Sequence, residues 1–102
     1  MFNDCINTKQ SLNMQDLENY NIRNTLLYER KIAFQKIIYI ERQIIQLQYK
    51  LLDLYITQES YNEITQEIEY YKNELIDAKK NHEICRNNFN DAYNAHIKNL
   101  LK

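Results

Sequence analysis

The stretch that decides the fold is Ala33–Leu54, which reads AFQKIIYIERQIIQLQYKLLDL. Taken in alternating steps of four and three, one series in this stretch is apolar without exception: Ala33, Ile37, Ile40, Ile44, Leu47, Leu51 and Leu54. This spacing places the series on one side of an α-helix, as in the a and d positions of a coiled coil. The stretch therefore predicts a long helix that buries one side along its length.

A second apolar row runs beside the first and widens the apolar side of the helix. Its members are Leu27, Phe34, Ile38, Ile45, Leu52 and Tyr55. Together the two rows cover an arc of roughly 160°, whereas a two-stranded seam needs only the a and d columns. One neighbouring helix cannot cover that arc, so we expect the second row to form an interface with a partner.

The composition favours an all-α fold. The chain of 102 residues contains no glycine and no proline. Glycine supplies the positive φ angles of tight turns and bulges, and proline punctuates loops, so hairpins, sandwiches and βα units are very hard to build without them. The length allows one small domain at most.

A second apolar series begins after the first, in a shifted frame. It runs through Ile64, Ile68, Tyr71, Leu75, Ala78, His82, Cys85, Phe89, Ala92 and His96. The shift near Gln58 indicates either a turn between two helices or a stammer in one continuous rod. Ser60 and Glu63 have the spacing of a capping box, which favours a turn.

We therefore predict an antiparallel, coiled-coil-like helical hairpin, with a continuous rod as the alternative. The predicted bounds are a helix at about 12–57, a turn at about 57–60 and a helix at about 61–101. The predicted intra-hairpin core consists of Ala33, Ile37, Ile40, Ile44, Leu47, Leu51, Leu54, Ile64, Ile68, Tyr71, Leu75 and Phe89.

The N-terminal part of the chain gives weaker signals. Residues 1–10 are mostly polar, and we expect them to form a flexible segment. Ser11 or Asn13 suits a helix cap. Residues 19–25 prefer caps and turns, so they predict either a joint after a short extra N-terminal helix or a poorly packed length of one helix.

The charge and the number of cysteines limit which partners and which compartment we expect. The net charge is −1 and no basic cluster exceeds two residues, so we expect no nucleic-acid partner. The apolar run Ile37–Ile40 is too short to span a bilayer, so we expect no membrane insertion. Two cysteines that lie far apart make no disulfide framework, which favours an intracellular, reducing compartment: the cytoplasm first, an organelle as the alternative.

Three residues invite a chemical interpretation. His82 and Cys85 lie one helical turn apart, but zinc needs three or four ligands, and His96 lies about 16 Å further along a straight helix. Cys85 as a nucleophile would need a base and an oxyanion hole, and the chain offers no glycine-rich turn to build one. We expect no catalytic, cofactor or metal site, and we assign these residues to the helix seam.

The sequence thus predicts a non-catalytic structural subunit that binds helical partner chains, with a hetero-complex favoured over a homo-oligomer. Two alternatives remain open. One is a small regulatory adaptor or inhibitor that occupies a groove in its target. The other is a homo-oligomeric coiled coil in which several copies share the broad apolar face.

Overall fold

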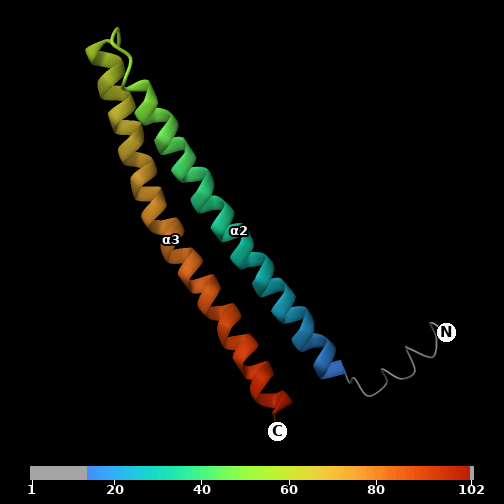
Figure 1. The fold of residues 1–102 in the computed structure, drawn as a ribbon. Helices are drawn as coiled ribbons and strands as arrows, with labels where there is room; N and C mark the ends of the chain where they lie inside the picture. Colours follow the sequence, from blue (N-terminus) through green and yellow to red (C-terminus); the bar gives the residue numbers. More distant parts are fainter. Residues whose placement is uncertain (1–13, 102) are drawn as a thin grey trace, which may run out of the picture.

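The computed structural model describes residues 14–101, which form two long helices joined by one loop (Figure 1). Helix α2 spans Met14–Lys50 and helix α3 spans Gln58–Leu100. The two helices run antiparallel and pack against each other, so that the molecule measures 71 × 30 × 17 Å. This confirms the predicted all-α hairpin. The predictions for residues 1–10 and for the caps at Ser11 and Asn13 lie outside the described residues.

Helix α2 is continuous through residues 19–25, where the sequence allowed a joint. Leu17, Tyr20 and Ile22 are each about half exposed there. Of the two alternatives for this stretch, the structure therefore shows the poorly packed length of a single helix. The prediction of a separate short helix within residues 14–25 is wrong, because the helical backbone hydrogen bonds persist even where the side chains pack poorly.

The loop that joins the helices covers residues 51–57, so α2 ends earlier than predicted. The N–H groups of Leu52 and Asp53 donate to carbonyls three residues back, which tightens the last turn of the helix. The Asp53 carboxylate then accepts a hydrogen bond of 2.9 Å from the backbone N–H of Tyr55. No described residue has a positive φ angle. The chain therefore reverses direction over several residues, because a tighter turn would need the φ > 0 geometry that glycine supplies.

Helix α3 begins with a cap at Thr57 rather than at Ser60, where the sequence placed it. The Thr57 hydroxyl accepts a hydrogen bond of 3.1 Å from the backbone N–H of Ser60. Tyr61 N–H donates to the Thr57 carbonyl at 2.9 Å and closes the first helical turn. Thr57 satisfies a donor that the helix itself leaves unpaired, so it fixes where α3 starts.

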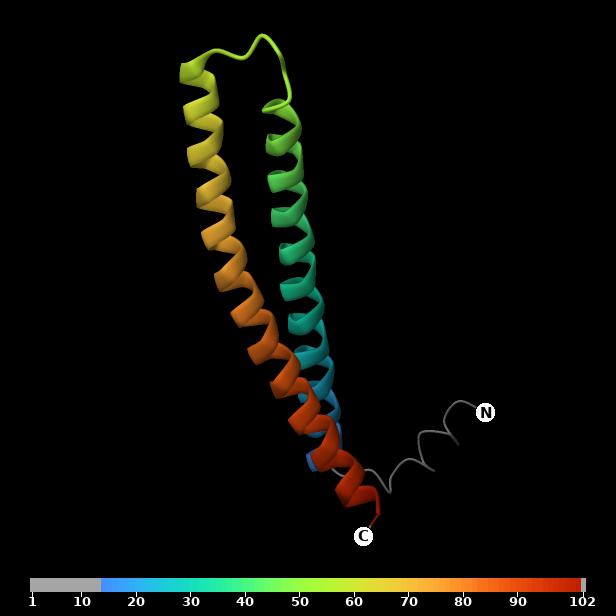
Figure 2. The same ribbon diagram turned by 60° about the vertical axis from the view of Figure 1, so that its left-hand side comes forward.

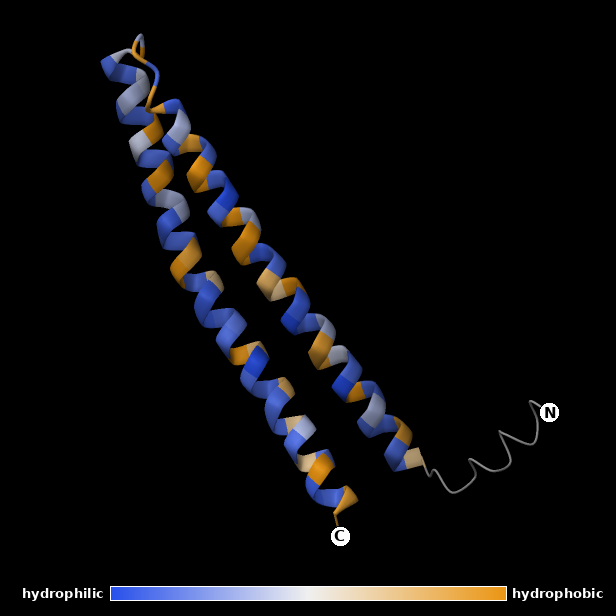
Figure 3. Ribbon diagram, viewed as in Figure 1, coloured by the Kyte–Doolittle hydropathy of each residue, from blue (hydrophilic) through white to orange (hydrophobic). Residues whose placement is uncertain are grey.

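The core is a narrow stripe between the two helices. The buried residues of the described chain are Ala33, Ile37, Ile40, Ile44, Leu47, Ile68 and Ala78. Leu51, Ile64, Tyr71 and Leu75 pack against this cluster and are partly buried. Figures 1 and 2 show the two helices running alongside each other from the loop to their free ends, and Figure 3 shows apolar segments recurring along both.

Leu54 corrects the predicted core. It is 93% exposed and lies in the loop, not in the seam. The heptad series runs on through Leu54 in the sequence, but the helix ends at Lys50, and without helical geometry the spacing no longer places a residue on the buried side. Phe89 is only partly buried, and it lies in the half of the hairpin where the seam is thinner.

Truncation of the core should destabilise the hairpin strongly. Ile40 is 3% exposed, so Ile40→Ala removes buried methyl groups and leaves a cavity, and we expect the free energy of unfolding to fall by about 2–5 kcal/mol. The measurement is urea unfolding followed by circular dichroism. Ile40→Val should lose only about 0.5–1.5 kcal/mol, and Ile84→Ala, at an exposed site, should lose less than Ile40→Ala. Equal losses for Ile40→Ala and Ile84→Ala would contradict this core.

The Thr57 cap makes a separate prediction. Thr57→Ala leaves the Ser60 N–H without its side-chain acceptor, and we expect a loss of about 0.5–2 kcal/mol in the free energy of unfolding. Thr57→Ser keeps the hydroxyl and should restore most of it. Ser60→Ala, which keeps the backbone donor, should cost less than Thr57→Ala. The reverse order would place the cap at Ser60.

Candidate interaction surface

The second apolar row of α2 is largely uncovered by α3. Phe34 and Ile45 are each about half exposed, and Leu52 is 72% exposed. Leu27 and Ile38 are partly buried at the edge of the seam. Apolar side chains that stay exposed next to each other often mark a place where another molecule binds. The row is therefore a candidate interaction surface.

Two contacts show how far α3 reaches toward this row. The Phe34 ring lies 5.6 Å from the His82 ring, centroid to centroid. One turn earlier, the Arg30 guanidinium lies 5.6 Å from the centre of the Phe89 ring, a cation–π contact. Both contacts lie toward the open end of the hairpin, where α3 carries aromatic and polar residues instead of Ile and Leu. Toward the loop, Ile45 and Leu52 remain exposed.

The sequence did not single out several further exposed apolar residues. Tyr28 and Ile32 on α2, and Ile76 and Ile84 on α3, are each about half exposed or more. Tyr39 and Tyr49 on α2 are also exposed. The seven-residue spacing of Ile32 and Tyr39 could have revealed them as a further line on the helix. The exposed apolar surface is therefore wider on α2 than the predicted row.

The loop adds an apolar tip at one end of the molecule. Leu54 and Tyr55 are both more than nine-tenths exposed, and Leu52 lies beside them in the chain. The sequence predicted Leu52 and Tyr55 as interface residues on the flank of a helix, but the structure places both in the loop. They therefore lie at the end of the rod, beyond the last turn of α2.

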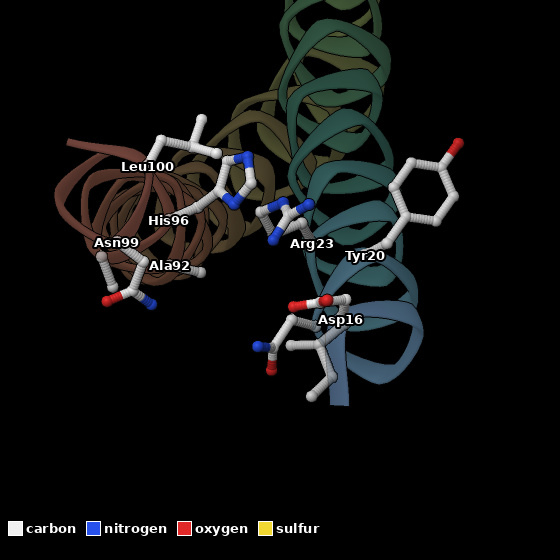
Figure 4. A pocket seen from close by; sticks show the side chains of 10 residues that line it. Asp16, Tyr20, Arg23, Ala92, His96, Asn99 and Leu100 are labelled. Carbon is white, nitrogen blue, oxygen red and sulfur yellow. The ribbon is translucent and has the colours of Figure 1, made fainter. Parts of the chain in front are cut away.

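The opposite end of the hairpin is open and polar. An open cavity of about 560 Å³ lies between the N-terminal turns of α2 and the C-terminal turns of α3. Arg23 and His96 extend toward each other across it, and Asp16, Ala92 and Asn99 also line it (Figure 4). These residues occupy the heptad positions that Ile and Leu fill nearer the loop. The helices therefore have less apolar surface to bury here, and the seam stays loose.

The structure shows what surrounds the residues that invited a chemical interpretation. His82 contacts Phe34, and Cys85 is a partly buried free thiol that lines a shallow groove with Ala33 and Tyr28. Within residues 14–101 no three side chains of the metal-ligating types lie close enough to hold an ion. His96 lies in the open-end cavity, away from His82 and Cys85.

Tyr71 lies in the seam between the helices, and its pKa is raised there. Partial burial between the helices raises its pKa above the ordinary value of 10.0, and the neighbouring Tyr39, Glu67 and Tyr70 raise it further. The Tyr70 ring meets the Tyr71 ring edge-on at 5.4 Å. Tyr71 packs against the buried cluster of the seam, a setting that disfavours the charged phenolate.

Neither helix of the described chain has an apolar stretch long enough to cross a bilayer. Comparisons with protein families, with characterised proteins and with solved structures give no match to this chain.

The Tyr71 pKa predicts how stability depends on pH. Its pKa is raised in the folded state, so its contribution to stability is fully present below the unfolded pKa of about 10 and is lost as pH rises through the folded pKa. We expect the free energy of unfolding to fall at alkaline pH, and Tyr71→Phe should make that fall smaller. Urea unfolding at a series of pH values measures this, with Tyr49→Phe, at an exposed site, as the control. An alkaline fall of the same size in Tyr71→Phe as in the unsubstituted chain would refute the assignment.

Proposed function

We propose that this chain is a non-catalytic interaction subunit that binds helical partner chains through the apolar row that runs along α2 and into the loop that follows it. The row consists of Leu27, Phe34, Ile38, Ile45, Leu52 and Tyr55. The observation that carries the proposal is Ile45, which is 49% exposed midway along the packed half of α2, between the buried Ile44 and Leu47. If another chain covers an isoleucine at that place, its apolar surface leaves water, which is favourable.

The limited burial in the hairpin supports the same proposal. No large side chain in residues 14–101 is less than 2% exposed. A pair of helices can bury only the facing stripe of each partner, and a small domain buries too little apolar surface to be very stable alone. A helix packed onto the α2 row would deepen the burial of Ile38, Phe34 and Ile45 together. The proposed contact is therefore part of what stabilises the fold.

The partner is expected to present a helix, because the row is a straight line along a rigid helix. Helix-in-groove recognition reads apolar side chains spaced by three, four and seven residues, which is the spacing of the row. The sequence favours a different chain as the partner, in a hetero-complex, and self-association through the same row is the second form of the proposal.

A pair of matched substitutions tests the proposal. Ile45→Asp places a charge in the row, and Ile84→Asp places the same charge at a site on α3 that is 58% exposed. We expect Ile45→Asp to abolish association, measured as loss of the partner chain and of the associated mass after gentle purification, because burying an unpaired carboxylate is costly. Ile84→Asp should associate as the unsubstituted chain does.

Circular dichroism of both variants serves as the control for folding. Both sites are exposed in the isolated hairpin, so the two variants should keep equal helicity before association. If Ile45→Asp and Ile84→Asp associate equally well, the row is not the interface and the proposal fails.

A further inference from the structure

The tip of the hairpin consists of Leu52, Leu54 and Tyr55, which lie in the loop between α2 and α3 (Figure 1). Among the exposed large apolar side chains of residues 14–101, Leu54 and Tyr55 have the two highest exposed fractions, at 93% and 92%. Leu54 is not a member of the α2 row. The tip is therefore an apolar surface at the end of the rod, whereas the row runs along its side.

The conformation of the loop does not depend on burial of the tip side chains. The Tyr55 N–H donates to the Asp53 carboxylate at 2.9 Å, and the Ile56 N–H donates to the Asp53 carbonyl at 3.3 Å. Leu51 and Ile56 are partly buried, and Leu51 packs against the core cluster. The loop thus turns two of its apolar residues inward and leaves the tip in water.

The chain around the tip is acidic. From residue 51 to residue 71 there is no lysine or arginine, although the whole chain has nearly as many basic as acidic residues. Asp53 lies in the loop itself, and Glu59 and Glu63 follow in the first turns of α3, all three exposed. Lys50, the last residue of α2, is the nearest cation along the chain. The tip therefore combines apolar side chains with neighbouring negative charge.

That charge distinguishes between the two kinds of surface that receive apolar loops, a bilayer and a pocket in a protein. Segments that lie in a membrane interface carry lysine and arginine beside their apolar residues, because the cytoplasmic leaflet is negatively charged. The carboxylates beside the tip would be repelled by such a leaflet. A protein pocket whose rim is basic would attract them instead.

We propose that the tip inserts into an apolar pocket of a partner protein whose rim carries lysine or arginine, with Leu54 and Tyr55 as the anchors. The Tyr55 ring enters the pocket and its hydroxyl stays at the polar rim, where tyrosine is common in interfaces. The basic rim faces the carboxylates of Asp53 and Glu59. This end-on contact goes beyond the proposed function, which places a partner helix along the side of α2.

The first experiment tests whether the tip has a role in folding. Leu54→Ala removes a side chain that is almost fully exposed, so we expect its urea unfolding midpoint to equal that of the unsubstituted chain. Leu51→Ala is the matched change at a residue that packs against the core, and its midpoint should fall. If Leu54→Ala lowers the midpoint as much as Leu51→Ala does, the tip is structural and the proposal is overturned.

The second experiment identifies the partner and measures its affinity. The photoreactive residue p-benzoylphenylalanine replaces Leu54 in the full chain, and irradiation in the native cells attaches it to whatever protein contacts the tip. That protein is then purified. We expect Leu54→Ala to raise its Kd for the chain about tenfold or more. Leu100→Ala, an exposed leucine at the other end of the rod, should leave the Kd unchanged. Attachment to no protein would overturn the proposal.

The basic rim has its own test with the same purified protein. Glu59→Gln removes one charge beside the tip, and we expect it to raise the Kd about two- to fivefold at low salt and less at high salt. Glu18→Gln is the matched control, because it changes an exposed glutamate near the start of α2. An equal Kd for Glu59→Gln and for the unsubstituted chain would overturn the basic rim.

Vesicles of phosphatidylcholine and phosphatidylserine test the membrane instead of a protein. We expect the chain not to sediment with them. Sedimentation that Leu54→Ala abolishes would show that the tip enters a bilayer, and the proposal would be overturned.

The outcomes also separate this inference from the proposed function. If Ile45→Asp releases the partner and Leu54→Ala does not, the tip contact is overturned and the row remains the interface. If Leu54→Ala weakens binding and Ile45→Asp does not, the proposed function fails and the tip contact stands.

Discussion

The seam between α2 and α3 is the constraint on which the rest of the structure depends. Its buried cluster takes two residues from α3, Ile68 and Ala78. The others come from α2: Ile37, Ile40, Ile44 and Leu47. A single helix contacts only the facing side of its neighbour, so α3 leaves part of the apolar side of α2 uncovered. The width of α2's apolar side therefore exceeds the width that its own chain can cover.

The two ends of the hairpin differ for the same reason. Near the loop the seam is filled with Ile and Leu, and the helices pack closely. Near the open end the equivalent positions hold Arg23, His96 and Asn99, and an open cavity remains between the helices. Burial of apolar surface is what brings helices together in water, so a seam of polar residues stays loose. The part of the proposed interface around Ile38 and Ile45 lies along the well-packed half, where α2 is held in one position by the core.

Rigidity matters for the proposed function. An interface on a helix that is already fixed by a core pays little ordering entropy when a partner binds. The loop is held less firmly. Leu54 and Tyr55 lie at its exposed tip, where the Tyr55 N–H donates a hydrogen bond to the Asp53 carboxylate. The central part of the row, around Ile38 and Ile45, is therefore the part best suited to fix the register of a partner helix.

The sequence by itself determined the fold class, the helical content and most of the core. Absence of glycine and proline removed the alternatives to helices, and the apolar spacing from Ala33 to Leu47 identified the buried side, because helical periodicity links spacing to direction. The shift in frame near Gln58 indicated a turn or a stammer there, and the structure has a loop at residues 51–57, just before that position. Of the row that the sequence predicted, Phe34 and Ile45 are exposed on α2, Leu27 and Ile38 are partly buried, and Leu52 and Tyr55 lie in the loop.

Only the tertiary structure decided where the helices end and which apolar residues stay in water. The pattern runs without interruption through Leu51, Leu52 and Leu54, so periodicity alone could not show that α2 stops at Lys50 and that Thr57 begins α3. Helix ends depend on hydrogen bonds to single groups, here those of Asp53 and Thr57, which spacing does not encode. Exposure in turn depends on how far a neighbouring helix reaches, and that follows from the size of side chains brought together from distant parts of the chain.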